Sequence, residues 1–364
     1  MLRVVDHPKV DRDYPGSYGD VLAWFPDDAA CLDYLDWLRW PDGFCCPHCE
    51  STLGWRLADA RWSCGGCSRR VSATAGTIFH GTRTPLTVWF AAAWHMTSQK
   101  QGISALGLKR VLGVGSEQTA WAMLHRYRTA MIRPGRDRLA GVVEVDEMYV
   151  GGPEPGRSGR GALGKTLVAI AVEKTHDVLG RCRMQVIPDA SAASLREFLD
   201  HHVEPGALVV TDGWPSYPPA IAGKYRHERI PVSTLDGQAH VLLPAVHRVA
   251  GLVKRWLLGT HQGGVKPEHL QAYLDEFAFR FNRRRARTRG MLFYRLLQQA
   301  VEAPPRTYRS LVAVPRRGYS QRRHPPPLPK RVHADSLARD PAQRPWRVNP
   351  LPTTVTSGSL GLLH

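Results

Sequence analysis

The chain has 364 residues, of which 43% are hydrophobic, and this content predicts a globular protein with a core in two or three domains. Lys and Arg number 49 against 32 acidic residues, and the net charge of +17 favours a polyanionic partner, nucleic acid first. Basic ribosome-associated and membrane-surface proteins share such a balance, so the position of the charges matters more than their sum. No apolar run reaches the roughly 18 residues of a membrane span, and the start lacks a signal peptide, so we expect a soluble, cytoplasmic protein without a membrane partner.

Residues 1–42 form the first predicted unit, an N-terminal helical segment. Within it, residues 20–40 begin with acidic Asp20, which suits a helix N-terminus. Apolar side chains then follow at mixed helical spacing, at Leu32, Leu35, Trp37 and Leu38. We expect one short amphipathic helix here.

Residues 43–75 carry two CxxC pairs with fourteen residues between them. The four cysteines are Cys46, Cys49, Cys64 and Cys67. Each pair points two thiolates at one centre, and two pairs supply the tetrahedral sulfurs that Zn²⁺ prefers at ~2.3 Å. A segment this short cannot bury a core, so ligation worth on the order of 10 kcal/mol must hold it folded. We predict a zinc ribbon with a closed, structural zinc; two unrelated redox pairs are the alternative.

Aromatic and basic residues surround these cysteines. They are Trp55, Trp62, Arg56, Arg61, Arg69 and Arg70. Such side chains allow the ribbon to touch a phosphate backbone, although ribbons also bind proteins. Cys45 breaks the CxxC spacing, and Cys31 and Cys182 are typical of buried thiols.

Residues 85–135 have the pattern of two helices around the glycine turn "LGVGSEQ", with Ser116 as the N-cap of the second helix. The side chains expected to bury the pair are Ala105, Leu108, Leu112, Ala120 and Leu124. Those expected to point outward are Lys109, Arg110, Gln118, His125, Arg126 and Arg128. Helix pairs of this kind are frequent, so the prediction of a DNA-binding helix-turn-helix depends on these outer residues, with Lys109, Arg110, Gln118 and Arg126 as its DNA contacts.

Residues 140–300 open with the strand "VVEVDEMYVGG", which carries three acids, Glu144, Asp146 and Glu147, where a sheet favours uncharged side chains. Strands "TLVAIAVE" and "CRMQVI", a helix at 191–202 and strand "ALVVTDGW" follow. This is an RNase H-like order, an α/β fold in which the first and fourth strands are neighbours. Asp146 and Asp212 would then converge.

Two converging carboxylates repel each other unless cations lie between them, and hard oxygen ligands favour Mg²⁺ or Mn²⁺. Two such ions about 4 Å apart serve phosphodiester chemistry. The alternative is structural: Asp212 with Gly213 is also a common turn signal, and Asp146 can pair with an arginine.

A third metal ligand is expected from the predicted helix "LPAVHRVAGLVKRWLLGTHQGG". His247 and Lys254 stand seven residues apart, about two turns, so both side chains emerge on one face. Glu147 and Asp236 are the reserve carboxylates. If His247 is instead packed in the core, the protein would be a DNA binder without activity.

The next segment has an apolar stripe that predicts core packing, followed by a run of arginines. The stripe is Leu270, Tyr273, Leu274, Phe277 and Phe281, and the arginines are Arg280, Arg283, Arg284, Arg285, Arg287 and Arg289. The run is either a solvated face or a contact with the DNA backbone; we favour DNA contact by Arg283 and Arg284, together with Arg255. Residues 316–364 are basic and rich in proline, and this tail is expected to be disordered.

Several of these motifs together resemble the zinc-ribbon insertion-sequence transposases of the DDE superfamily, the ISXO-type group of bacterial elements. The resemblance spans roughly residues 20–312. It is carried by "CPHC" with "WSCGGC", "SATAGTIFHGTRTPLTVWF", "VEVDEMYVGG", "VVTDGW", "HRVAGLVKRWLLGTHQGG" and "HLQAYLDEFAFRFNRR".

The resemblance implies an RNase H-like transposase core with Asp146 and Asp212 as the first two metal ligands and Lys254 as the accompanying lysine. The general pattern has Glu seven residues before that lysine, and many relatives have Asn nearby; here the residue is His247. Imidazole is a softer, neutral ligand, so weaker metal binding and a leaning toward Mn²⁺ are expected.

A transposase of this group would bind its element's DNA ends, hydrolyse a phosphodiester at each end and join the freed 3′-hydroxyls to target DNA. Action on two ends implies a homodimer or a higher oligomer, in a bacterial cytoplasm and on the nucleoid when DNA is bound. The alternatives are a non-enzymatic DNA-binding regulator and a structure-specific nuclease.

Overall fold

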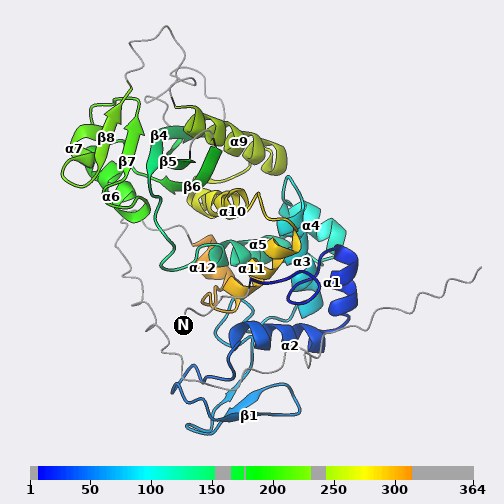
Figure 1. Ribbon diagram of the computed structural model, residues 1–364. Helices are drawn as coiled ribbons and strands as arrows, with labels where there is room; N and C mark the ends of the chain where they lie inside the picture. The colour runs from blue at the N-terminus through cyan, green and yellow to red at the C-terminus, as the bar shows by residue number, and fades with distance from the viewer. Residues whose placement is uncertain (1–6, 152–164, 176–177, 231–242, 314–364) are drawn as a thin grey trace, which may run out of the picture.

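The computed structural model describes residues 7–151, 165–175, 178–230 and 243–313. Figure 1 shows a mixed sheet with its covering helices at one end of the molecule, a helical body in the middle and a small β-structure at the other end. Among the described helices, none combines the length and the apolar character that crossing a bilayer requires. The predicted tail at 316–364 and the reserve carboxylate Asp236 lie outside the described residues.

The N-terminal segment forms two helices, so the expectation of one helix over 20–40 was wrong. Helix α1 spans Tyr18–Trp24 and helix α2 spans Asp28–Arg39. Pro26 lies between them and cannot continue a helix, while the Asp27 side chain accepts a hydrogen bond from the backbone N–H of Ala30 and caps the second start. A proline followed by a good N-cap therefore ends one helix and begins another.

The small β-structure consists of three short antiparallel strands, β1 (Gly54–Arg56), β2 (Trp62–Cys64) and β3 (Arg70–Val71), in the order β1-β2-β3. Its core is continuous with that of the helical body, because Phe44 stacks on Trp62 with ring centroids 4.9 Å apart and Trp40 packs edge-on against both rings.

The helical body is built from α3 (Leu86–Ser98), α4 (Ala105–Leu112) and α5 (Glu117–Ala130), packed with α1 and α2. Helix α11 (Gly290–Ala300) comes from the far end of the chain and inserts Phe293, Leu296 and Leu297 into the same core. A short helix α12 (Tyr308–Val312) lies against α5. The helical body is thus completed by residues that follow the sheet domain in sequence.

The large sheet contains β4 (Val142–Val150), β5 (Thr166–Thr175), β6 (Val178–Val186), β7 (Leu208–Thr211) and β8 (Arg226–Arg229), in the order β6-β5-β4-β7-β8. Strands β5 and β6 are antiparallel to their neighbours, whereas β4, β7 and β8 run parallel. The first and fourth strands are therefore adjacent at the centre, as expected. Long central β4 is the only strand that joins the antiparallel half to the parallel half.

Helices cover both faces of this sheet. Helix α6 (Ala192–His202) and the short α7 (Tyr217–Ile221) pack on the face that carries Val143 and Val145. Helices α9 (Pro244–His261) and α10 (Leu270–Asn282), preceded by a 3₁₀ turn η3 (Pro267–His269), pack on the face that carries Met148 and Ile170. Because side chains alternate along a strand, even-numbered residues of β4 point to the α9 side and odd-numbered residues to the α6 side.

The sheet domain and the helical body meet through buried polar contacts. Arg128 on α5 donates a 2.8 Å hydrogen bond to Glu276 on α10, and both side chains are almost fully buried, at 1% and 0% exposure. Trp256 and Thr260 of α9 both donate to the backbone carbonyl of Gln101. These contacts hold α10 against α5, and α9 against the loop between α3 and α4.

Candidate functional site

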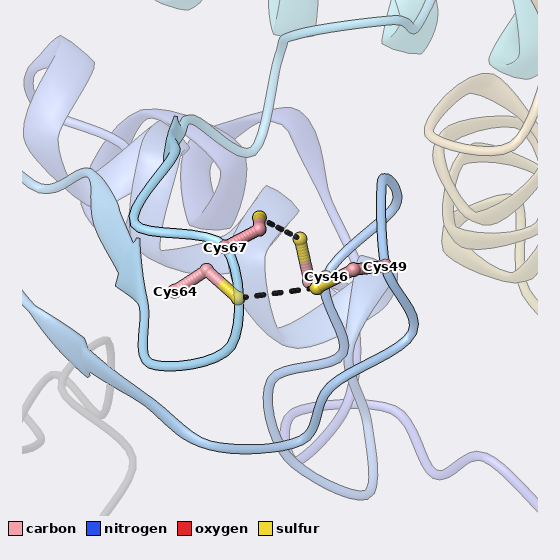
Figure 2. A group of neighbouring side chains, drawn as sticks. All are labelled: Cys46, Cys49, Cys64 and Cys67. Atoms are coloured by element: carbon pink, nitrogen blue, oxygen red, sulfur yellow. Dashed lines mark hydrogen bonds between the residues drawn. The ribbon is translucent and has the colours of Figure 1, made fainter.

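The four predicted cysteines come together in one cluster, shown in Figure 2. All four sulfur atoms lie within 4.8 Å of one another, with Cys46 and Cys67 3.7 Å apart and Cys49 and Cys64 3.5 Å apart. Four sulfurs at ~2.3 Å from a tetrahedral zinc ion stand about 3.8 Å apart, so the observed spacing fits a zinc ion. The donor set is four thiols on two turns, which supports the predicted structural zinc site.

The ribbon is fastened to α2, and this changes the predicted roles of its aromatic and basic residues. The indole N–H of Trp62 donates to the Asp36 carboxylate, and Trp62 is 6% exposed, so it is a packing residue and not a surface for DNA. Arg56 is paired with Asp33 and Arg61 with Asp59. Trp55 remains exposed, at 57%.

Asp146, midway along β4, and Asp212, the residue after β7, lie just beyond the paired part of these two adjacent parallel strands. The register pairs Glu144 with Val210, and each aspartate is two residues beyond its member of that pair. Both therefore share the face that α9 covers. The Asp212 carboxylate accepts a 3.0 Å hydrogen bond from the backbone N–H of Trp214, which ties it to the turn after β7.

His247 is the fourth residue of α9, and its side chain lies near Asp146. Its Nε2 is 3.9 Å from Asp146 Oδ2, and the side chains are 33% and 16% exposed. His247 is therefore at the surface of a shallow site and not packed in the core. Carboxylate oxygens are donors that suit Mg²⁺ and Mn²⁺, whereas an imidazole nitrogen is a softer donor that suits Mg²⁺ less well.

Glu144 takes a role that its sequence pattern did not indicate. Its carboxylate is 2% exposed and accepts hydrogen bonds of 2.8 and 3.0 Å from the backbone N–H groups of Ala245 and Val246. Helix α9 has no capping side chain of its own, so a strand residue satisfies its first N–H groups and places a negative charge at its positive end. Glu144 thereby sets the position of His247.

Glu147 points to the other face, where Tyr217 of α7 is fully buried. The pKa of the Tyr217 hydroxyl is raised well above its ordinary value, first by burial and then by the charges of Glu147, Asp146 and Asp212. The charges of all three carboxylates thus affect the pKa of this one hydroxyl. We call Asp146, Glu147 and Asp212 the acidic cluster. No feature of the sequence indicated a role for Tyr217. For Glu144 there was one indication, an acidic residue in a predicted strand, but not its partner on α9.

The acidic cluster is less compact than the cysteine site. Among the residues that the structure describes, the cysteines are the one set of three or more His, Cys, Asp or Glu side chains whose ligand atoms all lie within 4.8 Å of one another. Lys254, two turns beyond His247 on α9, is exposed, as are Arg248 and Arg255. The exposed side of α9 is therefore basic next to the acidic cluster.

The helix pair α4 and α5 agrees with the sequence in its capping and its core. Ser116 accepts a hydrogen bond from the backbone N–H of Thr119, and Gly113 ends α4 in the left-handed conformation. Leu108, Ala120 and Leu124 are buried. Arg110 and Gln118 are exposed, whereas Lys109 and Arg126 are half-buried, with Arg126 donating to the backbone carbonyl of Arg306.

Two residues expected on the outer face of this pair were placed wrongly. His125 and Arg128 are 3% and 1% exposed because α10 covers that side of α5. The covering helix carries Glu276, 148 residues later, and this distant carboxylate makes the burial of Arg128 possible.

The guanidinium groups of Arg283 and Arg284 contact aromatic rings and backbone carbonyls of this chain. Arg283 lies over the Phe279 ring and donates to its backbone carbonyl, and Arg284 lies over Phe281 and donates to carbonyls of β6 and α10. Of the same run, Arg285, Arg287 and Arg289 are exposed.

Comparison with known proteins gives two family matches and one relative. The model of an ISXO2-like transposase domain matches residues 138–282, and the model of a transposase zinc-ribbon domain matches residues 26–70. An uncharacterized transposase-like protein of Haemophilus influenzae is 30% identical over 97 residues, which cover 27% of this chain and 77% of that protein. The first matched range includes Asp146, Asp212, His247 and Lys254, and the second includes all four clustered cysteines.

Proposed function

This chain belongs to the family of ISXO2-like transposases with an N-terminal zinc ribbon, and we propose that it binds the DNA ends of its insertion sequence and cuts and joins DNA strands there. The observation that carries the proposal is that Asp146 and Asp212 lie on one face of two adjacent central strands, with His247 Nε2 3.9 Å from Asp146 and a basic helix face beside them.

We infer that the sheet domain is RNase H-like. The strand order β6-β5-β4-β7-β8, with the first three strands antiparallel and the fourth parallel to the first, supports this assignment. We infer in the same way that α4 and α5 act as a helix-turn-helix. The exposed part of α5 is its first turn, where Gln118 lies, and the first turn is the part of a recognition helix that contacts base edges.

Asp146, Asp212 and His247 would hold Mg²⁺ or Mn²⁺. When bound, such ions lower the pKa of a water or a 3′-hydroxyl and stabilise the charge that develops on the phosphate. Asp146 and Asp212 supply the negative charge that attracts the cations, and His247 adds a neutral nitrogen donor from the opposite element. Glu147, on the reverse face near Tyr217, would keep Asp146 in an acidic field without touching DNA.

Lys254 and Arg255 on α9 would bind the phosphates that flank the reacting bond. Both are exposed on the helix that carries His247, so a strand held by them passes over the acidic cluster. Lys109, Arg110, Gln118 and Arg126 would contact end DNA from the helical body, and the zinc ribbon would add a further contact through its exposed side. Two ends must be held at once, so we propose that the active complex contains at least two copies.

The experiment that tests this function uses a supercoiled plasmid with candidate element ends. Incubation with the protein and Mg²⁺ or Mn²⁺ should produce nicked and joined products, and omission of the divalent ion should leave retarded but intact plasmid. Retardation without any cutting in either metal would instead identify a DNA-binding regulator, and cutting without joining would identify a nuclease.

A further inference from the structure

A cavity of about 610 Å³ lies where strand β6 meets α10, α11 and the segment before β4. Its size is in the range of about 300 to 1,000 Å³ that small-molecule sites occupy. Its lining contains six arginines: Arg133, Arg136, Arg181, Arg183, Arg283 and Arg295. The carboxylates in the lining are those of Asp137 and Glu302. The cavity is therefore strongly cationic.

Neutral groups hold several of these guanidinium groups in place. Arg183 is 5% exposed and donates hydrogen bonds of 3.0 and 2.8 Å to the backbone carbonyls of Cys182 and Asp137. Arg283 donates to the carbonyl of Phe279, and Arg295 donates to the amide oxygen of Gln298 at 2.7 Å. Carbonyl and amide oxygens orient an arginine without cancelling its charge.

Only some of the six cavity arginines have a carboxylate as a partner. Arg181 is paired with Glu173, and Asp137 lies 3.7 Å from Arg133 and 3.9 Å from Arg181. Across the described ranges, four of the arginines have no carboxylate within 4.0 Å: Arg136, Arg183, Arg283 and Arg295. The positive charges of the cavity thus exceed the negative charges that face them.

The arginines also act on one another. Burial lowers the pKa of Arg183 to about 10, and the neighbouring charges of Arg136 and Arg181 lower it further in the same direction. Burial likewise lowers the pKa of Arg283 to about 10, with contributions from Arg295 and Arg133. Like charges gathered in a partly buried space destabilise the free protein, and a bound anion removes that penalty.

We propose that this arginine cavity is a binding site for phosphate groups, with Arg136, Arg183 and Arg283 as its principal donors. Guanidinium groups match phosphate oxygens through two parallel hydrogen bonds, and they do so most strongly where water is partly excluded. The phosphates come either from the backbone of a DNA strand or from a free polyphosphate compound, since both present the same oxyanions.

The cavity is separate from the acidic cluster on β4. The cavity lies at β6, the edge strand, which is two positions away from β4 in the order of the sheet. Neither Asp146 nor His247 lines the cavity. The proposed phosphate site therefore does not depend on whether the acidic cluster cuts DNA.

Arg136→Gln is the variant that tests the site. Among the described residues, Arg136 makes no side-chain hydrogen bond and no ion pair within 4.0 Å; its acidic neighbour is the buried Asp275, so the substitution removes the charge and breaks no hydrogen bond. Arg226→Gln is the matched control, because Arg226 is exposed on β8, the opposite edge of the same sheet. Circular dichroism and thermal melting establish that each variant is folded.

Two ligands distinguish the sources of the phosphate. Inorganic tripolyphosphate is titrated calorimetrically, and duplex DNA binding is followed by fluorescence anisotropy over a series of salt concentrations. In Arg136→Gln, tripolyphosphate binding should weaken by about tenfold or more, whereas Arg226→Gln should match wild type. A slope of log affinity against log salt that falls by about one in Arg136→Gln assigns the site to the DNA backbone; an unchanged slope with weaker tripolyphosphate binding assigns it to a free compound.

Unchanged affinity for both ligands in Arg136→Gln, relative to Arg226→Gln, would overturn the proposal. Should Arg136→Gln fail to fold, Arg133→Gln takes its place, because the Arg133 side chain is 55% exposed and makes only one long ion pair, to Asp137.

Discussion

Glu144, near the start of β4, accepts a 2.8 Å hydrogen bond from the backbone N–H of Ala245 in the first turn of α9, although 101 residues separate the two. A second bond from Val246 reaches the same carboxylate oxygen, and Lys174 Nζ lies 3.6 Å from the other oxygen. A strand and a helix are thus held together by a charge placed at the positive end of the helix. His247 directly follows Val246, so this contact anchors the turn of α9 that carries the imidazole near Asp146.

Glu144→Gln should destabilise the protein by roughly 1 to 2 kcal/mol, because it keeps an acceptor oxygen but removes the charge at the helix end. Glu144→Ala should be worse, by about 1 to 3 kcal/mol more, because two buried N–H groups lose their acceptor. Urea unfolding measures both. Equal stability of wild type and Glu144→Ala would show that α9 is held by its apolar contacts alone.

Asp146→Asn and Asp212→Asn should each abolish plasmid cleavage while leaving binding to end DNA intact, because each removes the negative charge proposed to hold a divalent cation. Glu204→Gln, a change of an exposed acid after α6, is the matched control and should cut normally. Gel retardation and nicking assays on the same preparations separate binding from cleavage. Normal plasmid cleavage by Asp146→Asn would disprove the proposal that Asp146 holds a catalytic metal ion.

His247→Ala should reduce cleavage in both metals, and more strongly in Mn²⁺ than in Mg²⁺, because it removes the softer nitrogen donor and leaves the two carboxylates in place. His247→Glu restores an acidic oxygen donor and should shift the preference toward Mg²⁺. Rates measured across a titration of each metal check this. If His247→Ala keeps full cleavage activity in Mg²⁺ while Glu147→Gln loses it, the third metal ligand is Glu147 and not His247.

Zinc should bind at one ion per chain and hold the ribbon folded. Cys46→Ser removes a buried ligand and should lower both zinc content and thermal stability. Cys45→Ser is an adjacent control outside the cluster and should retain the zinc. Atomic emission measures the metal, and scanning calorimetry measures the transition. The prediction fails if Cys46→Ser keeps its zinc.

Acid should destabilise the junction between α5, α9 and α10. Burial, followed by the charge of Arg128, lowers the pKa of His125 to about 2 and that of His261 to about 3. An unfolded histidine titrates near 6.5, so below that pH the unfolded chain binds protons that the folded chain does not. Stability is therefore full above about pH 6.5 and falls as the pH drops, by up to about 1.4 kcal/mol per unit for each histidine.

Urea unfolding at pH 7.5, 6.5 and 5.5 checks this dependence. His125→Phe keeps a ring against Trp121, which lies 4.0 Å away between centroids, and should flatten the fall relative to wild type. His201→Gln changes an exposed histidine on α6 and should leave the dependence as it is. Identical pH profiles for wild type and His125→Phe would contradict the assignment.

Local patterns in the sequence determined the parts of the protein whose interactions are short in range. The CxxC spacing predicted the zinc ligands, because each pair is a single turn, and Ser116 predicted the start of α5, because a cap bonds only three residues ahead. The alternation of strands and a helix predicted that β4 and β7 would be neighbours and that Asp146 and Asp212 would end on the same side.

Only the tertiary structure decided what each charged residue on these elements does. Three acids within four residues of β4 have different partners, because alternate side chains face opposite layers: Glu144 meets the start of α9, Asp146 meets His247, and Glu147 lies near Tyr217. Arg128 was expected on an outer, DNA-facing side of its helix, yet α10 covers it. A basic residue looks the same in sequence whether it faces solvent or a carboxylate 148 positions later, and only the packing of distant elements distinguishes the two.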